Sequence, residues 1–245
     1  MHMSEPLRSQ QQGTVPSSDC GSVLAAAVRQ VPETPRTSQP IYELSRGYDV
    51  LVVGALGNYS GRKANSKWEQ EWEFYKLGKL CRSIVGIDID PELVRLAGED
   101  GHDIRLADAE SFNLNAKFDV IYATHIIEHL NSPGSLLIQS LKHLKRGGVL
   151  IVETPNPFGI NVAGRVLFKG TAVGGPQPTR HTCWIDEQNA EELGRRSGLQ
   201  LIRTCYYTAI NPFGLAMKIR TVVYMLAGKL RKRWNCNAVY MYQAN

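Results

Sequence analysis

Hydrophobic and polar positions alternate in blocks along the chain. Short apolar runs of strand length are each followed by a segment with the three- to four-residue spacing of an amphipathic helix. Strands are predicted at residues 49–54, 83–88, 103–106, 118–124 and 149–153, and helices at 67–81, 90–97 and 135–144. Strands that alternate with helices at this spacing predict a parallel sheet covered on both faces.

The last part of the chain carries the same two patterns in a different order. We predict a helix at residues 186–197 that ends at Gly198, a strand at 199–206, a helical stretch at 215–232 and a closing strand at 238–242. The last two strands are joined by a hairpin-like excursion, and strands joined in this way run antiparallel. The predicted fold is therefore an α/β sheet that is mostly parallel, with one antiparallel edge strand.

The composition is that of a globular protein. Of the 245 residues, 43% are hydrophobic and 21% are charged, which suffices for one core and excludes a wholly disordered chain. Residues 1–40 are rich in Ser, Gln, Pro and Thr, so we expect a disordered or loosely docked leader before one domain at 41–245. No apolar run approaches membrane-spanning length and no secretory signal is visible, which favours a cytoplasmic protein.

Charge and cysteine content exclude further classes. The net charge of +5 is mild for a chain of this length and does not by itself indicate a nucleic-acid partner. The five cysteines are scattered and show no C-x-x-C spacing, which argues against a disulfide framework or a zinc cage.

Glycines and acids follow the predicted strands where ligands bind in open α/β sheets, at the carboxyl ends of the strands. The first strand leads into a loop with Gly54 and Gly57, which permit a tight turn and a close approach of the backbone to a ligand. Asp88 ends the second strand, where a carboxylate can accept hydrogen bonds from both hydroxyls of a ribose. Asp108 follows the third strand and can accept from the exocyclic amine of adenine. Each acid alone is consistent with an ordinary turn, but together they favour a ligand that contains adenosine.

With these strand ends in place, the chain resembles the class I S-adenosylmethionine-dependent methyltransferases. The resemblance covers about residues 45–210, and its EHL and TPN patterns are most similar to ubiquinone-type and glycan or natural-product O-methyltransferases. It implies a Rossmann-like, seven-stranded sheet with helices on both faces, S-adenosylmethionine as cofactor and S-adenosylhomocysteine as product. Carried over residue by residue, it assigns cofactor binding to Gly54, Ala55, Gly57, Asp88, Ile89, Asp108, Ala109, Glu110, Thr124 and His125.

One position departs from the family pattern. The family's first strand usually carries an acid ahead of a Gly-x-Gly-x-Gly loop, whereas this chain has Val52 at that position and glycines at 54, 57 and 61. The sequence therefore does not show which group holds the amino end of the cofactor. A non-catalytic binding module that keeps the fold stays open as an alternative to an active enzyme.

Histidines are the natural candidates for a base that deprotonates a hydroxyl acceptor, because an unperturbed imidazole has a pKa of about 6.5. We select His125, at the end of the fourth strand, and His181, ahead of the helix at 186–197, as catalytic residues. His102 and His143 fall on predicted surface segments.

A metal site is the alternative use of one of these histidines. In the ubiquinone-type enzymes a Glu-x-x-Glu-His cluster holds a divalent metal, and the resembling trio in this chain is His125, Glu128 and His129. A structural role for Glu128 and His129 is favoured over a metal, so we predict no metal ion.

Two further segments bear on the partner of the protein. We interpret residues 157–183 as a lid over the acceptor pocket and residues 213–234 as an inserted amphipathic helix with a basic end. A cover for the sheet edge or a homodimer face is favoured for the helix over peripheral contact with a membrane, and nucleic acid is not favoured. We expect methyl transfer to a hydroxyl of a small molecule or glycan, with an RNA or protein methyltransferase as the alternative.

Overall fold

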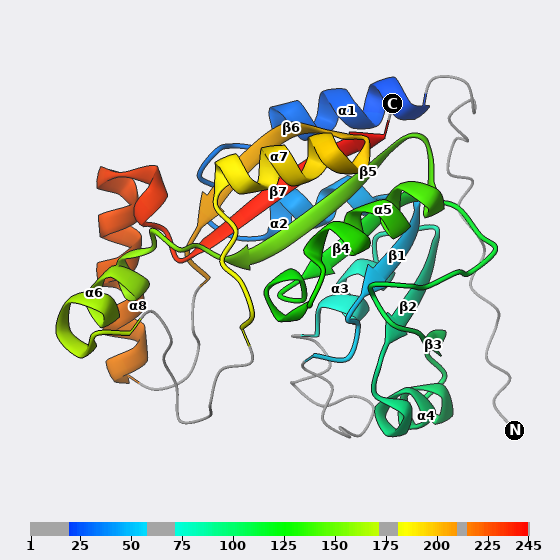
Figure 1. The fold of residues 1–245 in the computed structure, drawn as a ribbon, viewed down its shortest axis with the longest axis horizontal. Helices are drawn as coiled ribbons and strands as arrows, with labels where there is room; N and C mark the ends of the chain where they lie inside the picture. Colours follow the sequence, from blue (N-terminus) through cyan, green and yellow to red (C-terminus); the bar gives the residue numbers. More distant parts are fainter. Residues whose placement is uncertain (1–19, 58–71, 172–180, 210–214, 245) are drawn as a thin grey trace, which may run out of the picture.

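A seven-stranded sheet forms the centre of the protein (Figure 1). The computed structural model describes residues 20–57, 72–171, 181–209 and 215–244. The strand order is β3-β2-β1-β4-β5-β7-β6, and only β7 runs antiparallel to its neighbours. The strands are β1 (Asp49–Val53), β2 (Ser83–Asp88), β3 (Ile104–Leu106), β4 (Phe118–Thr124), β5 (Leu144–Pro155), β6 (Leu199–Tyr207) and β7 (Asn237–Ala244). The predicted fold class is confirmed, and the antiparallel strand lies one place inside the edge strand β6.

Helices cover both faces of the sheet because the strand side chains alternate. Val50 and Val52 pack against α1 to α4 on one face, and Leu51 and Val53 belong to the core under α5 and α7 on the other. The helical segments are α1 (Cys20–Gln30), α2 (Gln39–Tyr42), η1 (Glu43–Ser45), α3 (Glu73–Gly78), α4 (Pro91–Glu99), η3 (Ile127–His129), α5 (Pro133–His143), α6 (Ile160–Lys169), α7 (Glu187–Ser197), α8 (Leu215–Leu230) and η4 (Lys232–Trp234). The central strands therefore contribute to two hydrophobic layers.

Local capping signals set the ends of two helices as predicted. The Asp90 carboxylate accepts hydrogen bonds from two backbone N–H groups at the start of α4, and Pro91 occupies the first helical turn. Asp186 caps α7 in the same way, and Gly198 ends it in the left-handed conformation with φ of 79°. Both helices begin, and α7 also ends, where the sequence indicates because the signals are contained in a few neighbouring residues.

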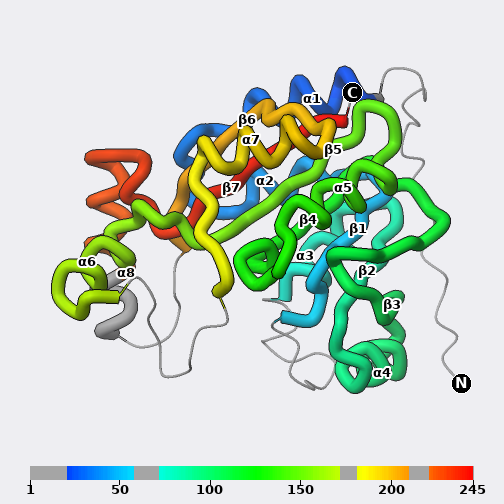
Figure 2. Tube along the Cα trace, in the orientation of Figure 1, coloured from blue at the N-terminus to red at the C-terminus, as the bar shows by residue number. Residues whose placement is uncertain are grey.

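The second half of the expected leader is part of the folded domain. Helix α1 lies across β5 and β6, strands that come much later in the chain (Figure 2), and buries Leu24 and Val28 in the core. Its Gly21 meets Gly147 of β5 so closely that a Cβ atom on Gly147 would lie 2.5 Å from the Gly21 Cα. The predicted boundary at residue 40 is therefore wrong for residues 20–40, while residues 1–19 lie outside the described structure.

Two predicted segments differ most clearly in length from the observed elements. The strand expected at 149–153 extends over Leu144–Pro155 and passes through the two glycines at 147 and 148 with an irregularity in its pairing to β4. The helix expected at 67–81 is α3, and its first part lies outside the described residues, as does most of the loop that precedes residue 181 in the expected lid. Within the described residues, no helix is long and apolar enough to cross a bilayer.

Candidate functional site

A small cavity opens at the carboxyl ends of β1, β2 and β3, and five of the predicted cofactor residues line it. These are Gly54, Asp88, Ile89, Asp108 and Ala109, together with Val53, Ile87, Ala107, Ile126 and Leu130. The predicted residues thus come from three different strand ends and meet at one place, which is the position at which open α/β sheets bind ligands.

The backbone around this cavity is held by the same acids. Gly54 has φ of 72°, a left-handed conformation that a glycine adopts at no steric cost, and its position faces the Ile126 side chain. One oxygen of Asp88 accepts a hydrogen bond from the Leu56 N–H at 2.9 Å and so fixes the loop after β1. Asp108 is exposed, and one of its oxygens accepts from the Glu110 N–H at 2.9 Å. Both acids therefore keep lone pairs for a ligand.

Five of the predicted cofactor residues do not line the cavity: Thr124 and His125 at the end of β4, and Ala55, Gly57 and Glu110. Glu110 turns away, because its carboxylate accepts a hydrogen bond from the Ser132 N–H at the start of α5. Ala55 is buried, and its carbonyl accepts a bond of 2.6 Å from the Trp72 indole, while Gly57 only closes the turn with Gly54. These last three residues support the loop rather than face the cavity.

The His125 ring lies between two carboxylates at the end of β4. Its Nδ1 is 3.4 Å from Glu128 Oε1 and its Nε2 is 3.2 Å from Glu153 Oε1. The residue has φ of 52°, which turns the chain sharply after the strand, and its backbone N–H donates to the Glu153 carbonyl. Desolvation lowers the pKa of His125, but the hydrogen bonds and charges of the two glutamates outweigh it and raise the pKa to about 10.

His125 is therefore an imidazolium at neutral pH and has no lone pair with which to take a proton. Glu128 is buried, and although desolvation raises its pKa, the His125 charge and hydrogen bond lower it overall. Thr154 donates a further bond of 3.0 Å to Glu128. The predicted role of His125 as a base is not supported, and the structure makes it the cation of an ion-paired network.

We expect the His125 ring to stay protonated from pH 6 to pH 8.5, which a nitrogen-resolved NMR titration measures directly, with His125→Gln to assign the signal. Because the folded pKa of about 10 lies above the ordinary 6.5, the resulting stability is present in full below pH 6.5 and is lost as the pH rises through 10. The difference in unfolding free energy between the protein and His125→Gln should shrink over that interval. A ring midpoint near 6.5 would contradict the assignment.

Glu73 is a site residue that the sequence analysis missed. It begins α3, directly after Trp72, and accepts a hydrogen bond of 2.9 Å from the Thr124 hydroxyl at the end of β4. Desolvation and the nearby charge of Glu153 raise the pKa of Glu73 to about 7. Its only signal in the sequence is an acid inside the helix predicted at 67–81, which by itself is an ordinary helical position.

His181 reaches the same region from a distant part of the chain. The Thr182 N–H donates to the Glu128 carbonyl at 2.8 Å and its hydroxyl donates to the Leu130 carbonyl at 2.6 Å, so the segment at 181–183 runs beside η3. The His181 ring contacts the rings of His129 and Trp184, with centroids 4.8 and 5.6 Å apart. The predicted candidates His125 and His181 are thus brought together around Glu128.

The protonation of His181 is opposite to that of His125. Desolvation and the neighbouring His129 and His125 lower its pKa below the ordinary 6.5, against the opposing charge of Glu128. Its Nδ1 is buried and has no hydrogen-bond partner within the part of the chain that the structure describes. His181 is therefore neutral at pH 7, and one buried nitrogen is available to a ligand, a proton or an ion.

The metal-ligand set differs from the one expected. Glu128, His129 and His181 can each offer one ligand atom, and these atoms lie within 4.8 Å of one another. His125, the first residue of the expected trio, turns both ring nitrogens toward carboxylates and is protonated, so His181 takes its place. A carboxylate with two imidazoles fits a divalent transition metal such as zinc better than magnesium, which prefers oxygen ligands.

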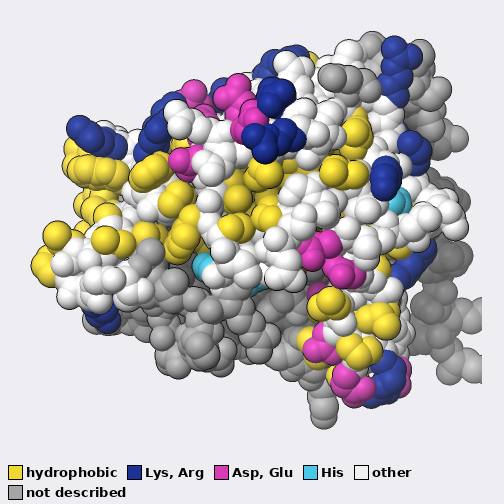
Figure 3. Space-filling model, in the orientation of Figure 1, with side chains coloured by type: hydrophobic (Ala, Val, Ile, Leu, Met, Phe, Trp, Pro, Cys, Tyr) yellow, Lys and Arg dark blue, Asp and Glu magenta, His cyan; other side chains and the backbone are white. Residues whose placement is uncertain are grey.

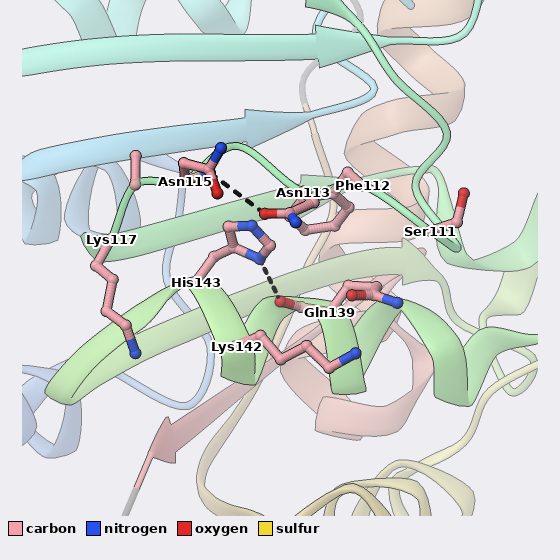
Figure 4. A pocket seen from close by; sticks show the side chains of 9 residues that line it. Ser111, Phe112, Asn113, Asn115, Lys117, Gln139, Lys142 and His143 are labelled. Atoms are coloured by element: carbon pink, nitrogen blue, oxygen red, sulfur yellow. Dashed lines mark hydrogen bonds between the residues drawn. The ribbon is translucent and has the colours of Figure 1, made fainter.

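A larger cavity, of about 490 Å³, lies at the opposite end of the strands, between the segment before β4 and helix α5 (Figure 4). His143 is buried there, and its ring is fixed because Nδ1 is 2.7 Å from the Gln139 carbonyl and Nε2 accepts from the Leu114 N–H. The prediction that His143 lies on the surface is wrong. This cavity is at the amino ends of the strands, where it brings together neither the strand-end acids nor the histidine pair.

The sequence match decides the family to which this geometry belongs. Residues 70–204, more than half of the chain, match the family described as methyltransferase domain. The chain belongs to the methyltransferase-domain family. The cavity with Gly54, Asp88 and Asp108 occupies the expected ligand position of this methyltransferase fold.

Known proteins support the same fold. The ubiquinone biosynthesis O-methyltransferase of Rattus norvegicus mitochondria is 26% identical over 150 residues, which cover 56% of this chain and 43% of that protein. The chain thus spans less than half the length of this curated relative. An S-adenosylmethionine-dependent methyltransferase structure from Mesorhizobium loti has a TM-score of 0.53 at 15% identity, covering 91% of this chain and 96% of that one. The cyclase SpnF has a TM-score of 0.50 at 18% identity, with 91% and 80% covered.

Proposed function

We propose that this methyltransferase domain moves the methyl group of S-adenosylmethionine to a hydroxyl of a small molecule or glycan, with His181 as the base. The observation that carries the proposal is that the cavity and the histidine cluster are neighbours at the carboxyl ends of the strands. The cavity with Asp88 and Asp108 suits adenosine, and the neutral His181 lies beyond it in the cluster around Glu128. The rat relative, an O-methyltransferase by name, supports oxygen as the methylated atom.

The cofactor is oriented by acids at successive strand ends. Asp88 accepts hydrogen bonds from the ribose hydroxyls and Asp108 accepts from the adenine amine. Glu73 supplies a carboxylate for the ammonium of the methionine moiety, which the buried Val52 cannot do. Glu128 and Glu153 together outnumber the one imidazolium of His125, and Glu73, with its pKa of about 7, is partly ionised at neutral pH, so this end of the site favours a cationic sulfonium.

Methyl transfer then needs alignment and one proton acceptor. The acceptor oxygen forms a bond to the methyl carbon as the carbon–sulfur bond breaks, and the bonding electrons stay on sulfur, which yields S-adenosylhomocysteine. The hydroxyl proton passes to His181, whose pKa lies below its ordinary value and which is therefore able to accept it at neutral pH. His125 stays protonated throughout and holds Glu128 and Glu153 in place.

The experiment that tests the proposal is a calorimetric titration of the protein with S-adenosylhomocysteine and S-adenosylmethionine. Micromolar binding, followed by transfer of labelled methyl from the cofactor to members of a panel of hydroxylated compounds, is the expected result. Binding without transfer to any hydroxyl would contradict O-methylation. No binding of either compound would favour the non-catalytic module.

A divalent transition metal at Glu128, His129 and His181 is a second role for the same cluster. An ion would acidify an acceptor hydroxyl bound beside it. Equilibrium dialysis against zinc should give one bound ion per chain, reduced on the order of tenfold or more in His181→Ala, with magnesium bound far more weakly. The matched control is His102→Ala, because His102 packs on Trp72 away from the cluster. Equal zinc binding by both variants would show that His181 is not a ligand.

A further inference from the structure

Exposed hydrophobic side chains gather on one projecting part of the molecule, formed by α6 and α8. Eight of the twelve large hydrophobic side chains that are exposed in the described residues belong to this part. We call them the α6–α8 surface: Phe158, Val166, Leu167, Phe168, Val222, Val223, Leu226 and Leu230. Figure 3 shows hydrophobic side chains over these two helices at the left end of the molecule. A single soluble domain rarely leaves such a cluster uncovered, so the surface needs an occupant.

The charges of the same two segments are all of one sign. Residues 157–171 and 215–234 contain eight basic residues and no acidic one, although the net charge of the whole chain is only +5. Lys169, Lys229 and Arg231 are exposed beside the apolar side chains. Two other basic residues are neutralised within the protein, since Lys232 pairs with Glu33 and Arg233 pairs with Glu187. The surface therefore combines exposed apolar groups with a basic border.

Helix α8 carries half of this surface, and Asn235 links it to the residue that follows β6. Val222, Leu226 and Leu230 follow one another at four-residue steps and form a stripe along α8. The next turn, η4, is held because the Asn235 side chain donates to the Lys232 carbonyl at 2.9 Å and accepts from the Thr208 hydroxyl at 3.1 Å. The stripe lies on the side of α8 that is exposed to solvent.

We infer that the α6–α8 surface docks on an anionic lipid bilayer, with its apolar side chains at the headgroup boundary and its basic residues against lipid phosphates. A stripe of apolar residues flanked by Lys and Arg is the pattern of helices that lie in a membrane interface. Nucleic acid would use the charges but leave the leucines and phenylalanines in water. Helix α6 follows the carboxyl end of β5, and α8 follows the carboxyl end of β6. Both helices therefore lie at the end of the strands that carries the site. Docking would place the carboxyl ends of the strands, and with them the site, next to the lipid.

Vesicle flotation tests this inference, and it does not depend on methyl transfer. The full chain should bind vesicles with 30% phosphatidylglycerol in phosphatidylcholine, bind pure phosphatidylcholine vesicles poorly, and lose binding at high salt. The double variant Leu226→Gln, Leu230→Gln should bind at least about tenfold more weakly, because two exposed leucines no longer enter the lipid. The matched control is Leu106→Gln, Ile138→Gln, which removes two exposed hydrophobic side chains elsewhere.

Two results would overturn the inference. Equal vesicle binding by the α8 double variant and its control would remove the surface from membrane contact. A concentration-dependent dimer that dissociates in the α8 double variant, without vesicle binding by the original chain, would assign the surface to a second copy of this protein. Circular dichroism of each variant shows whether the fold is kept, which both exposed positions allow.

Discussion

Replacing His181 by Ala should lower kcat by on the order of 100- to 10,000-fold while the dissociation constant for S-adenosylhomocysteine stays within about twofold. The large effect follows from the loss of the neutral His181 imidazole, which lies beside Glu128 and His129. The small effect on binding follows because His181 lies outside the cavity lined by Asp88 and Asp108. Steady-state rates with saturating cofactor and calorimetric titration measure the two quantities separately.

The pH profile distinguishes a base from a structural histidine. A base must be unprotonated, and the pKa of His181 lies below its ordinary 6.5, so activity should stay level from pH 8 down to about 6.5 and fall at lower pH. Added imidazole should restore part of the lost activity in His181→Ala by entering the space left behind. Full turnover in the variant, or a profile that rises only above pH 9, would remove His181 from proton transfer. Loss of activity when a chelator removes divalent metals would instead show that His181 acts as a metal ligand.

Replacing Asp88 by Asn should weaken S-adenosylhomocysteine binding by on the order of 100-fold, because a carboxylate that accepts two hydroxyl hydrogen bonds contributes about 3 kcal/mol. The amide oxygen of Asn can still accept from the Leu56 N–H, so the loop after β1 is kept. The matched control is Asp103→Asn, since Asp103 pairs with Arg105 at the other end of β3. Unchanged affinity in Asp88→Asn would contradict the ribose assignment.

The Glu73→Gln variant should respond differently from Asp88→Asn when both are titrated with two ligands. Glu73 is proposed to hold the ammonium of the cofactor, so its replacement should weaken S-adenosylhomocysteine about tenfold but leave 5′-methylthioadenosine, which lacks the amino-acid part, unchanged. Asp88→Asn should weaken both ligands alike, because both contain the ribose. Equal losses for the two ligands in Glu73→Gln would show that Glu73 acts through the fold, whereas a wild-type protein that binds neither ligand would instead reject the cofactor.

The sequence predicts those parts of the fold that depend on neighbouring residues. Asp90 and Pro91 start α4, and Gly198 ends α7, because capping and a left-handed turn are decided within one helical turn. Helix α1 was not predicted as part of the core, since Leu24 and Val28 become buried only against β5 and β6, which come more than a hundred residues later. The inner place of β7 is likewise a property of long-range pairing.

The candidate site likewise contains residues that the sequence predicts and residues that it does not. Gly54, Asp88 and Asp108 are predictable because parallel strands end at one edge of a sheet, whatever else the sequence contains. The protonation of His125 is not, because it depends on Glu153 from the neighbouring strand, and Glu73 becomes a site residue only through its contact with Thr124. Position along a strand is local information, whereas the charge state of a side chain is set by the three-dimensional surroundings.

The position of β7 between β5 and β6 determines the order in which the sheet can form. β7 is the last of the seven strands of this sheet to be synthesised, yet it hydrogen-bonds β5 on one side and β6 on the other. Until Asn237–Ala244 has emerged, the β5 edge is open and β6 has no strand partner in the sheet of the finished fold. Such open edges pair readily with other chains. Completion of the sheet therefore waits for these eight residues, and chains that lack them keep both edges open and are more exposed to aggregation than the finished fold.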